Sequence, residues 1–173
     1  MAEQVLRKGW WKAALVAIVV IEVLGGLSGW LSNSGYGNGW FDSLAKPSFM
    51  PPGWLFGVVW PILYALLGIA LGIILAKPHS SERRYALVWF GIQMVLNFAW
   101  SPLFFAAHDI ALAKIVIFVM AVCAAAAAVL FFRLSKVAGL LLVPYIAWLV
   151  FAATLNASIE RLNPGAGSSL LGI

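Results

Sequence analysis

Residues 52–76 read PGWLFGVVWPILYALLGIALGIILA, a stretch that contains no charged side chain. A helix that crosses the hydrocarbon core of a bilayer needs about 20 mainly apolar residues, and this stretch is long enough. Pro51 and Pro52 stand at its beginning, where the missing N–H of proline costs no helical hydrogen bond. We therefore predict a membrane-spanning helix over residues 52–76.

Four further apolar stretches of similar length lie at residues 10–31, 85–105, 111–132 and 137–159. The chain of 173 residues is 64% hydrophobic and 10% charged, whereas a soluble domain carries about 25% charged residues. Such a chain lacks the polar surface to face water. The sequence predicts an all-α integral membrane protein, with one five-helix domain over residues 1–161 and a flexible tail over residues 162–173.

The basic residues mark one side of the membrane, because cytoplasmic loops carry an excess of Lys and Arg. Most of the 11 Lys and Arg residues fall at the N-terminus and at alternate connections: Arg7, Lys8, Lys12, Lys77, Arg83, Arg84, Arg133 and Lys136. This pattern predicts an inner N-terminus, an outer C-terminus and an outer loop over residues 32–51. The net charge of +5 is thus explained by topology rather than by nucleic-acid binding. The bias favours a bacterial inner membrane, with an outer membrane as the alternative.

The predicted outer loop reads SNSGYGNGWFDSLAKPSFMP. Its first half is rich in Gly, Asn and Ser, and we expect it to be mobile. Its second half, from Trp40 to Pro51, mixes aromatic residues with prolines, and we expect it to be ordered. Long loops in compact domains are often lids or binding loops.

Gln93, Asn97 and Ser101 recur every four residues in the third span and therefore share one helix face. Polar side chains that face lipid are costly, so this stripe should face the interior of the bundle. Hydrogen bonding between helices is an equally good explanation for Gln93. For Asn97 we favour a role in a binding site.

Trp60, Trp148 and Asn97 come from three different spans and lie at similar depth. A rise of about 1.5 Å per residue puts all three some 12–17 Å below the predicted outer interface. Tyr64 and Tyr145 lie one turn deeper on the faces of Trp60 and Trp148. The sequence thus predicts a group of aromatic and polar side chains beneath the long loop.

Each of these three spans also contains a proline: Pro61, Pro102 and Pro144. An interior proline removes a helical hydrogen bond and bends the helix, and bends in neighbouring helices can open a cavity. One interpretation of the pattern is aromatic core packing with kinks. The other is a pocket for a large, flat, apolar ligand, in which indoles stack and donate N–H groups and Asn97 makes a specific polar contact.

The first, second and fourth spans carry weaker signals. Gly25 and Gly29, and likewise Gly68 and Gly72, form GxxxG pairs that permit close helix packing. Glu22 lies near mid-membrane with no basic residue at its depth, which makes it a functional candidate without an assigned role. The fourth span, with alanines at positions 124–128, is predicted to be mainly structural.

Residues for common catalytic chemistry are missing. No two carboxylates are spaced as an acid–base pair, and His79 and His108 fall on opposite predicted sides of the membrane. Cys123 is the one cysteine, so neither an intrachain disulfide nor a thiol metal cluster is expected. The sequence argues against a hydrolase or a metalloenzyme and predicts no metal site and no required cofactor. Any catalysis would use tryptophan or a bound cofactor.

Three ordered segments resemble the motifs of a known family. They are WFDSLAKPSFMPPGWLFGVVWPILYALLGIA at residues 40–70, LNFAWSPLFF at 96–105 and VPYIAWLVFAATLN at 143–156. Over residues 25–161 the chain resembles the translocator protein family, which includes the tryptophan-rich sensory proteins of bacteria and the mitochondrial peripheral benzodiazepine receptor.

The resemblance implies a five-helix bundle that forms a homodimer and holds a ligand cavity under the first loop. The ligands it implies are protoporphyrin IX and other tetrapyrroles, isoquinoline carboxamides, benzodiazepines and, in animals, cholesterol. The positions that match the family cavity are Phe49, Pro51, Trp60, Tyr64, Asn97, Trp100, Trp148, Ala152 and Leu155, to which depth and spacing add Ser101 and Tyr145. In two respects the chain departs from the family: Ala157 and Ser158 replace aromatic residues of the animal cholesterol motif, and the third span has no GxxxG pair.

Three functions stay open. The first is a membrane receptor for tetrapyrroles and related flat hydrophobic ligands, with a role in porphyrin sensing or homeostasis. The second is a transporter of porphyrins or other lipophilic molecules, although the sequence shows no inner gate. The third is light-dependent porphyrin degradation, for which the resemblance makes Trp60 and Trp148 the catalytic candidates.

Overall fold

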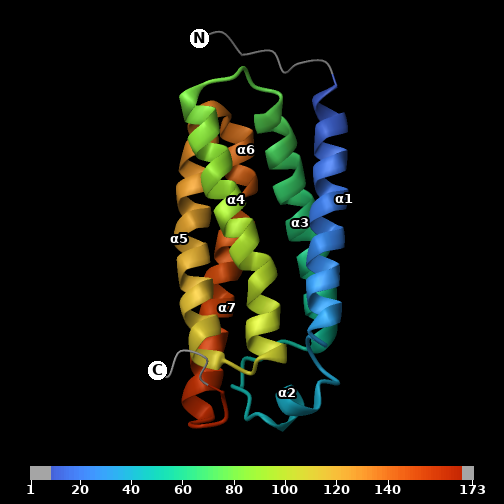
Figure 1. The fold of residues 1–173 in the computed structure, drawn as a ribbon, viewed down its shortest axis with the longest axis vertical. Coiled ribbons are helices and arrows are strands. Elements are labelled where there is room, and N and C mark those ends of the chain that lie inside the picture. The colour runs from blue at the N-terminus through green and yellow to red at the C-terminus, as the bar shows by residue number, and fades with distance from the viewer. Residues whose placement is uncertain (1–8, 169–173) are drawn as a thin grey trace.

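The computed structural model of the protein describes residues 9–168 and shows a long bundle of helices (Figure 1). Arg7 and Lys8 of the predicted inner terminus, and residues 169–173 of the predicted tail, lie outside the described residues. Within residues 9–168 every regular element is a helix, and five helical runs are long and apolar enough to cross a membrane. The predicted all-α integral membrane fold with five spans is confirmed, whereas its orientation in the membrane stays a prediction.

The spans are α1 (Trp10–Leu31), α3 (Gly53–Leu75), α4 (Ser81–Ser101) continued by η1 (Pro102–Ala106), α5 (Ile110–Leu134), and α6 (Lys136–Leu141) continued by α7 (Val143–Leu162). Polar caps extend some of them beyond the apolar stretches. Ser80 Oγ accepts the N–H of Arg83 at 3.1 Å before α4, and Asp109 Oδ1 accepts the N–H of Leu112 at 2.9 Å before α5. Since a side-chain cap stabilises a helix by about 1 kcal/mol, α4 begins a turn before the predicted residue 85.

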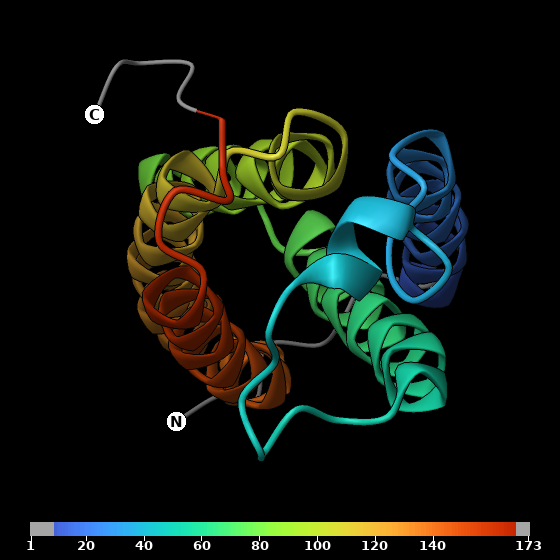
Figure 2. The same ribbon diagram turned by 90° about the horizontal axis from the view of Figure 1, so that it is seen from below.

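Helix α1 packs against α3, and both views show the two helices side by side (Figures 1 and 2). Glycines of α3 set the distance between them. A Cβ atom at Gly72 would lie 2.4 Å from Cα of Ala14, and one at Gly68 would lie 2.7 Å from Cα of Ile18. Both clashes involve backbone atoms, so a larger residue would push the helices apart. The GxxxG pair of α3 therefore serves packing within the chain.

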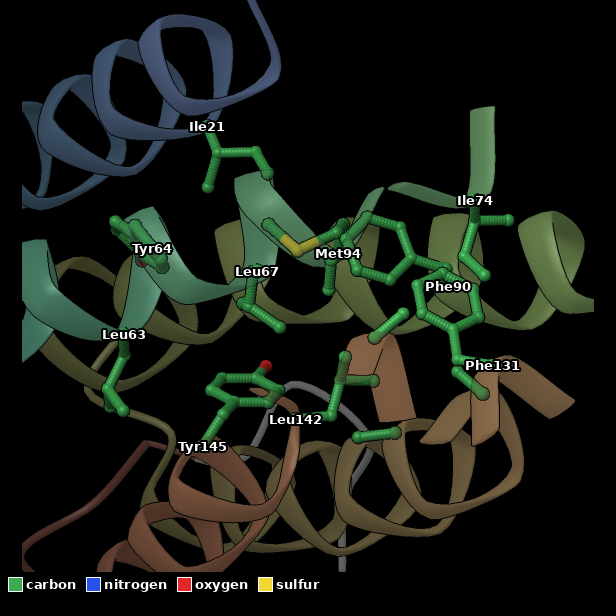
Figure 3. Packing of buried hydrophobic residues seen from close by; sticks show 14 of the residues in the cluster. Ile21, Leu63, Tyr64, Leu67, Ile74, Phe90, Met94, Phe131, Leu142 and Tyr145 are labelled. Carbon is green, nitrogen blue, oxygen red and sulfur yellow. The ribbon is translucent and has the colours of Figure 1, made fainter. Parts of the chain in front are cut away.

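A buried apolar cluster joins α1, α3, α4, α5, α6 and α7 (Figure 3). Leu67, Ile74 and Leu142 are fully buried in it, and the rings of Phe90 and Phe131 stack with their centroids 5.4 Å apart. These residues lie in the half of the bundle away from the long loop. Close packing there holds the five spans together, so the other half is free to separate around a cavity.

The helices separate toward the loop end, which we define as the end of the bundle that carries residues 32–52. Helix α3 packs against α6 at the far end but has few contacts with α7. Pro144 lies in the first turn of α7, directly after the break from α6, and Pro102 begins the π-helical turn η1. Pro61 lies inside α3 without ending it. Pro102 and Pro144 thus lie at irregular turns of two spans that border the gap between the helices.

The loop over residues 32–52 lies across the end of the bundle and contains the short helix α2 (Gly39–Ser43) (Figure 2). Its Gly- and Asn-rich first half, for which the sequence predicts mobility, is tied down by hydrogen bonds. Asn38 Oδ1 accepts the N–H of Phe41 at 3.1 Å, and Asn38 Nδ2 donates to the carbonyl oxygen of Asn33 at 3.0 Å. Gly35 and Gly37 adopt φ values of 98° and 95°, which residues with a side chain rarely reach. These turns give the first half a defined conformation, whereas its mobility stays a prediction.

The segment that follows α7 contacts the same loop. Asn163 Oδ1 accepts the N–H of Ala45 at 2.7 Å, and Asn163 Nδ2 donates to the carbonyl oxygen of Ala45 at 2.9 Å. The indole N–H of Trp40 donates to the carbonyl oxygen of Ala166 at 3.1 Å. The described part of the predicted flexible tail is thus hydrogen-bonded to the loop.

Candidate ligand-binding site

A cavity of about 550 Å³ lies under the loop and is lined by residues from all five spans. Its volume falls within the roughly 300–1,000 Å³ that is usual for small-molecule sites. Aromatic rings form much of its wall: Tyr36, Phe41, Phe56, Trp60, Tyr64, Trp100, Phe104, Phe105 and Trp148. The cavity can therefore surround a flat apolar molecule with ring faces from several helices.

A chain of hydrogen-bonded polar side chains begins at the deep end of the cavity and continues behind its wall. Tyr64 donates its hydroxyl hydrogen to Asn97 Oδ1 at 2.8 Å, and Asn97 Nδ2 donates to the Tyr145 hydroxyl at 3.0 Å. Tyr145 in turn donates to Gln93 Oε1 at 2.7 Å. These bonds connect α3, α4 and α7, and Figure 3 shows Tyr64 on α3 and Tyr145 on α7. Gln93 is thus used for hydrogen bonding between helices, which the sequence left as one of two explanations.

Three indoles line the cavity above this chain of hydrogen bonds. Trp60 lies against Tyr64 with ring centroids 5.3 Å apart, Trp148 meets Phe56 edge-on at 5.8 Å, and Trp100 stacks on Phe104 at 5.1 Å. The Nε1 atoms of Trp100 and Trp148 are buried and have no hydrogen-bond partner within residues 9–168. A buried N–H without an acceptor is costly, so both indoles are suited to donate to a bound molecule.

The charge of the cavity wall is unbalanced. Among the described residues that line it, Glu22 supplies the one carboxylate, and Lys, Arg and His are absent. Glu22 comes from α1 and reaches the same cavity as Tyr64, which gives this mid-membrane acid a location that the sequence could not supply. An anionic ligand group inside the cavity would meet no opposite charge from the described lining, and an unpaired buried charge is strongly unfavourable.

The loop closes the end of the cavity with Tyr36, Phe41 and Met50. Lys46 holds this cover together, because its Nζ donates to the carbonyl oxygen of Phe41 at 2.7 Å and lies 4.6 Å from the centroid of that ring. Ser34 is hydrogen-bonded to Ser101, which joins the loop to the end of α4. The loop thus lies over the aromatic side chains, where the sequence predicts a lid or binding loop.

The structure brings together most of the residues that the sequence predicts for the site. Eight of them line the cavity: Trp60, Tyr64, Asn97, Trp100, Ser101, Trp148, Ala152 and Leu155. Three others do not line it. Phe49 is 47% exposed and packs its ring edge-on against Phe151. Pro51 is buried, and its carbonyl oxygen accepts the hydroxyl hydrogen of Tyr36. Tyr145 is fully buried behind Asn97. Tyr145 lies too deep to touch the cavity, and its hydroxyl is used to hold Asn97.

Several lining residues were not predicted. Ile117 and Met120 show that α5 contributes to the wall, which adds a role to the span predicted to be mainly structural. Asn156 of α7 also lines the cavity. It follows Trp148 and Ala152 at four-residue spacing, and this periodicity was the signal that could have identified it. No comparable pattern marks Ile117 or Met120, because apolar residues in an apolar helix look alike in sequence.

Residues 16–162 match the model of the TspO/MBR family. The chain is 38% identical over 127 residues to Protein CrtK of Rhodobacter capsulatus, an alignment that covers 73% of this chain and 79% of that protein. It is 37% identical over 152 residues to Translocator protein of Sus scrofa, covering 87% and 90%. It is 39% identical over 126 residues to Tryptophan-rich protein TspO of Chlorobaculum tepidum, covering 72% and 80%. Because the family match spans most of the chain and the predicted resemblance is confirmed, this protein belongs to the TspO/MBR family.

Proposed function

We propose that this protein is a membrane receptor that binds tetrapyrroles such as protoporphyrin IX, and related flat hydrophobic molecules, in the cavity under its loop. The observation that carries the proposal is the cavity itself, which combines aromatic walls with the buried indole N–H groups of Trp100 and Trp148, neither of which has a partner among the described residues. Stacking faces and a few directed donors are what recognition of a flat apolar ring requires. Porphyrin sensing or homeostasis is the role that such binding would serve.

The charge of the wall limits how a porphyrin could lie. Because no cationic side chain lines the cavity among the described residues, ionised propionates would be unfavourable deep inside it. We therefore expect the ring system to occupy the level of Trp60 and Trp148. The propionates would point toward the loop end, where Ser34 and Ser101 line the wall and water is near.

The test is a titration of the purified full-length protein with protoporphyrin IX, followed by quenching of tryptophan fluorescence. We expect saturable quenching, with a dissociation constant that rises about three- to tenfold in Trp148→Phe or Asn97→Leu, since each change removes a polar group from the site. Trp11→Phe is the matched control, because Trp11 is an exposed residue of α1 outside the cavity lining. Quenching without saturation, or equal affinity in all the variants, would contradict the proposal.

The proposal also includes the predicted homodimer and the predicted bacterial inner membrane, with an outer membrane as the alternative. The GxxxG pair of α3 is occupied by α1 of the same chain, so a dimer would need another surface. Exposed apolar residues along α1, among them Val16, Val19 and Val23, are available for lipid or for a second copy. Mass measurement of the detergent-solubilised protein tests the dimer, and membrane fractionation of the producing cells tests the location.

A further inference from the structure

Asn156 is a buried polar residue of α7. It is 2% exposed and lines the cavity from α7. Neither its Nδ2 donor nor its Oδ1 acceptor has a hydrogen-bond partner within residues 9–168. Leu155, Ile159 and Phe105, which also line the cavity and belong to one apolar cluster, have no side-chain polar atoms to offer. A buried carboxamide in such surroundings is costly unless something in the cavity pairs with it.

Asn97, the other carboxamide of the wall, differs from it. Its Oδ1 accepts from Tyr64 and its Nδ2 donates to Tyr145, so much of its capacity is already used. The two asparagines are therefore not equivalent. Asn97 belongs to the hydrogen bonds that hold the helices together, whereas the donor and the acceptor of Asn156 both lack a partner within residues 9–168.

The shape of a carboxamide limits what would satisfy it. Its C=O acceptor and one N–H donor point along the same edge, so the complementary group has a donor beside an acceptor. A lactam has this arrangement, and the two groups can form a pair of parallel hydrogen bonds. An ionised carboxylate has acceptors only; it would leave Oδ1 of Asn156 facing a negative oxygen in a cavity whose described lining has no cation.

We infer that Asn156 is a specificity-determining residue that favours, among the flat ligands of the cavity, those with an uncharged lactam edge. This inference rests on the proposed ligand cavity. Trp148 lies two turns before Asn156 on the same face of α7, about 12 Å along the helix. A flat ligand that spans this distance could stack on the indoles and present its lactam to Asn156.

The experiment compares carbostyril, a flat bicyclic lactam, with N-methylcarbostyril, which lacks the donor but keeps the ring and a similar partition into detergent. Calorimetric titration of the full-length protein should show that the wild type binds carbostyril about tenfold more tightly than the N-methyl compound. In Asn156→Leu this ratio should fall to about one. Thr154→Val is the matched control, because Thr154 is an exposed residue of the same helix outside the cavity lining, and it should keep the ratio. Asn156→Ala, which removes the carboxamide without adding bulk, should also lose the preference and replaces the leucine variant if that variant does not fold.

Three results would overturn the inference: a wild-type ratio near one, a ratio that survives in both Asn156 variants, or tighter and Asn156-dependent binding of naphthoic acid, which would assign the site to carboxyl groups. Titration of the same samples with protoporphyrin IX separates this inference from the proposed function. If protoporphyrin IX saturates the wild type but the lactam ratio is near one, the cavity binds porphyrin and the role of Asn156 is wrong. If neither compound binds the wild type, the proposed function fails as well.

Discussion

Replacing Tyr145 by phenylalanine removes one hydroxyl from the middle of the bundle and leaves the ring in place. That hydroxyl accepts from Asn97 Nδ2 at 3.0 Å and donates to Gln93 Oε1 at 2.7 Å, so it bonds α7 to two residues of α4. Tyr145 is fully buried, and water cannot take the place of the lost oxygen without entering the core. The variant should therefore lose stability without loss of apolar packing.

The magnitude follows from the two bonds. Hydrogen bonds between helices within a membrane contribute about 0.6 kcal/mol each on average, and a buried group left without a partner costs about 1–3 kcal/mol. Gln93 would be left with no bond from either amide atom, because its Nε2 already lacks a partner among the described residues. Asn97 would keep its bond from Tyr64. We expect Tyr145→Phe to lower the free energy of unfolding by about 1–3 kcal/mol.

The assay is reversible unfolding in mixed micelles as the denaturing detergent is increased, followed by helical circular dichroism. Tyr64→Phe serves as a graded comparison, because it removes one bond to Asn97 and should cost about half as much. Tyr85→Phe is the control for loss of an exposed hydroxyl and should change stability by less than about 0.5 kcal/mol. If Tyr145→Phe proved as stable as Tyr85→Phe, the hydrogen bonds of Tyr145 would not stabilise the packing of α7 against α4.

Two further predictions concern helix packing and the loop. Gly72→Ala should destabilise the protein by about 1–3 kcal/mol in the same unfolding assay, because the new Cβ would lie 2.4 Å from Cα of Ala14. Gly26→Ala is the control and should be neutral, because its new Cβ meets no atom within 4 Å. Equal effects of the two changes would refute the close contact of α1 with α3. Asn163→Ala should speed hydrogen exchange at the amide of Ala45 by about two- to tenfold, since it removes the acceptor of that N–H and a second bond to the same residue. Unchanged exchange at Ala45 would show that the loop is held without Asn163.

Much of this protein follows from periodicity and composition. Apolar length alone predicts the spans, because a bilayer requires each crossing helix to bury its backbone polar groups within itself. Counting residues from the span ends places Trp60, Trp148 and Asn97 at one level, and the structure finds all three on one cavity wall. Depth is predictable because the rise per residue of a helix is constant.

The partners of these side chains depend on how the helices pack. The sequence places Tyr145 beside Trp148 in depth but cannot show that it lies behind Asn97 rather than in the cavity. The sequence of an apolar helix also does not show which of its residues face a cavity, so the sequence could not place Ile117 and Met120 of α5 in the wall. Both outcomes depend on the rotation of each helix about its own axis, which is set by contacts such as those of Gly68 and Gly72 with α1.

The number, length and composition of the spans are local properties, because each span is a continuous run of apolar residues. The unpaired state of Asn156 within residues 9–168 is not local, because it results from the way the helices pack around this side chain. Likewise, the Gly-rich half of the loop is ordered by bonds within the loop and to Ser101 of α4, distant in sequence. Local chemistry therefore predicts where this chain works and roughly what shape it binds, whereas the polar contacts available to a ligand arise only when the helices pack together.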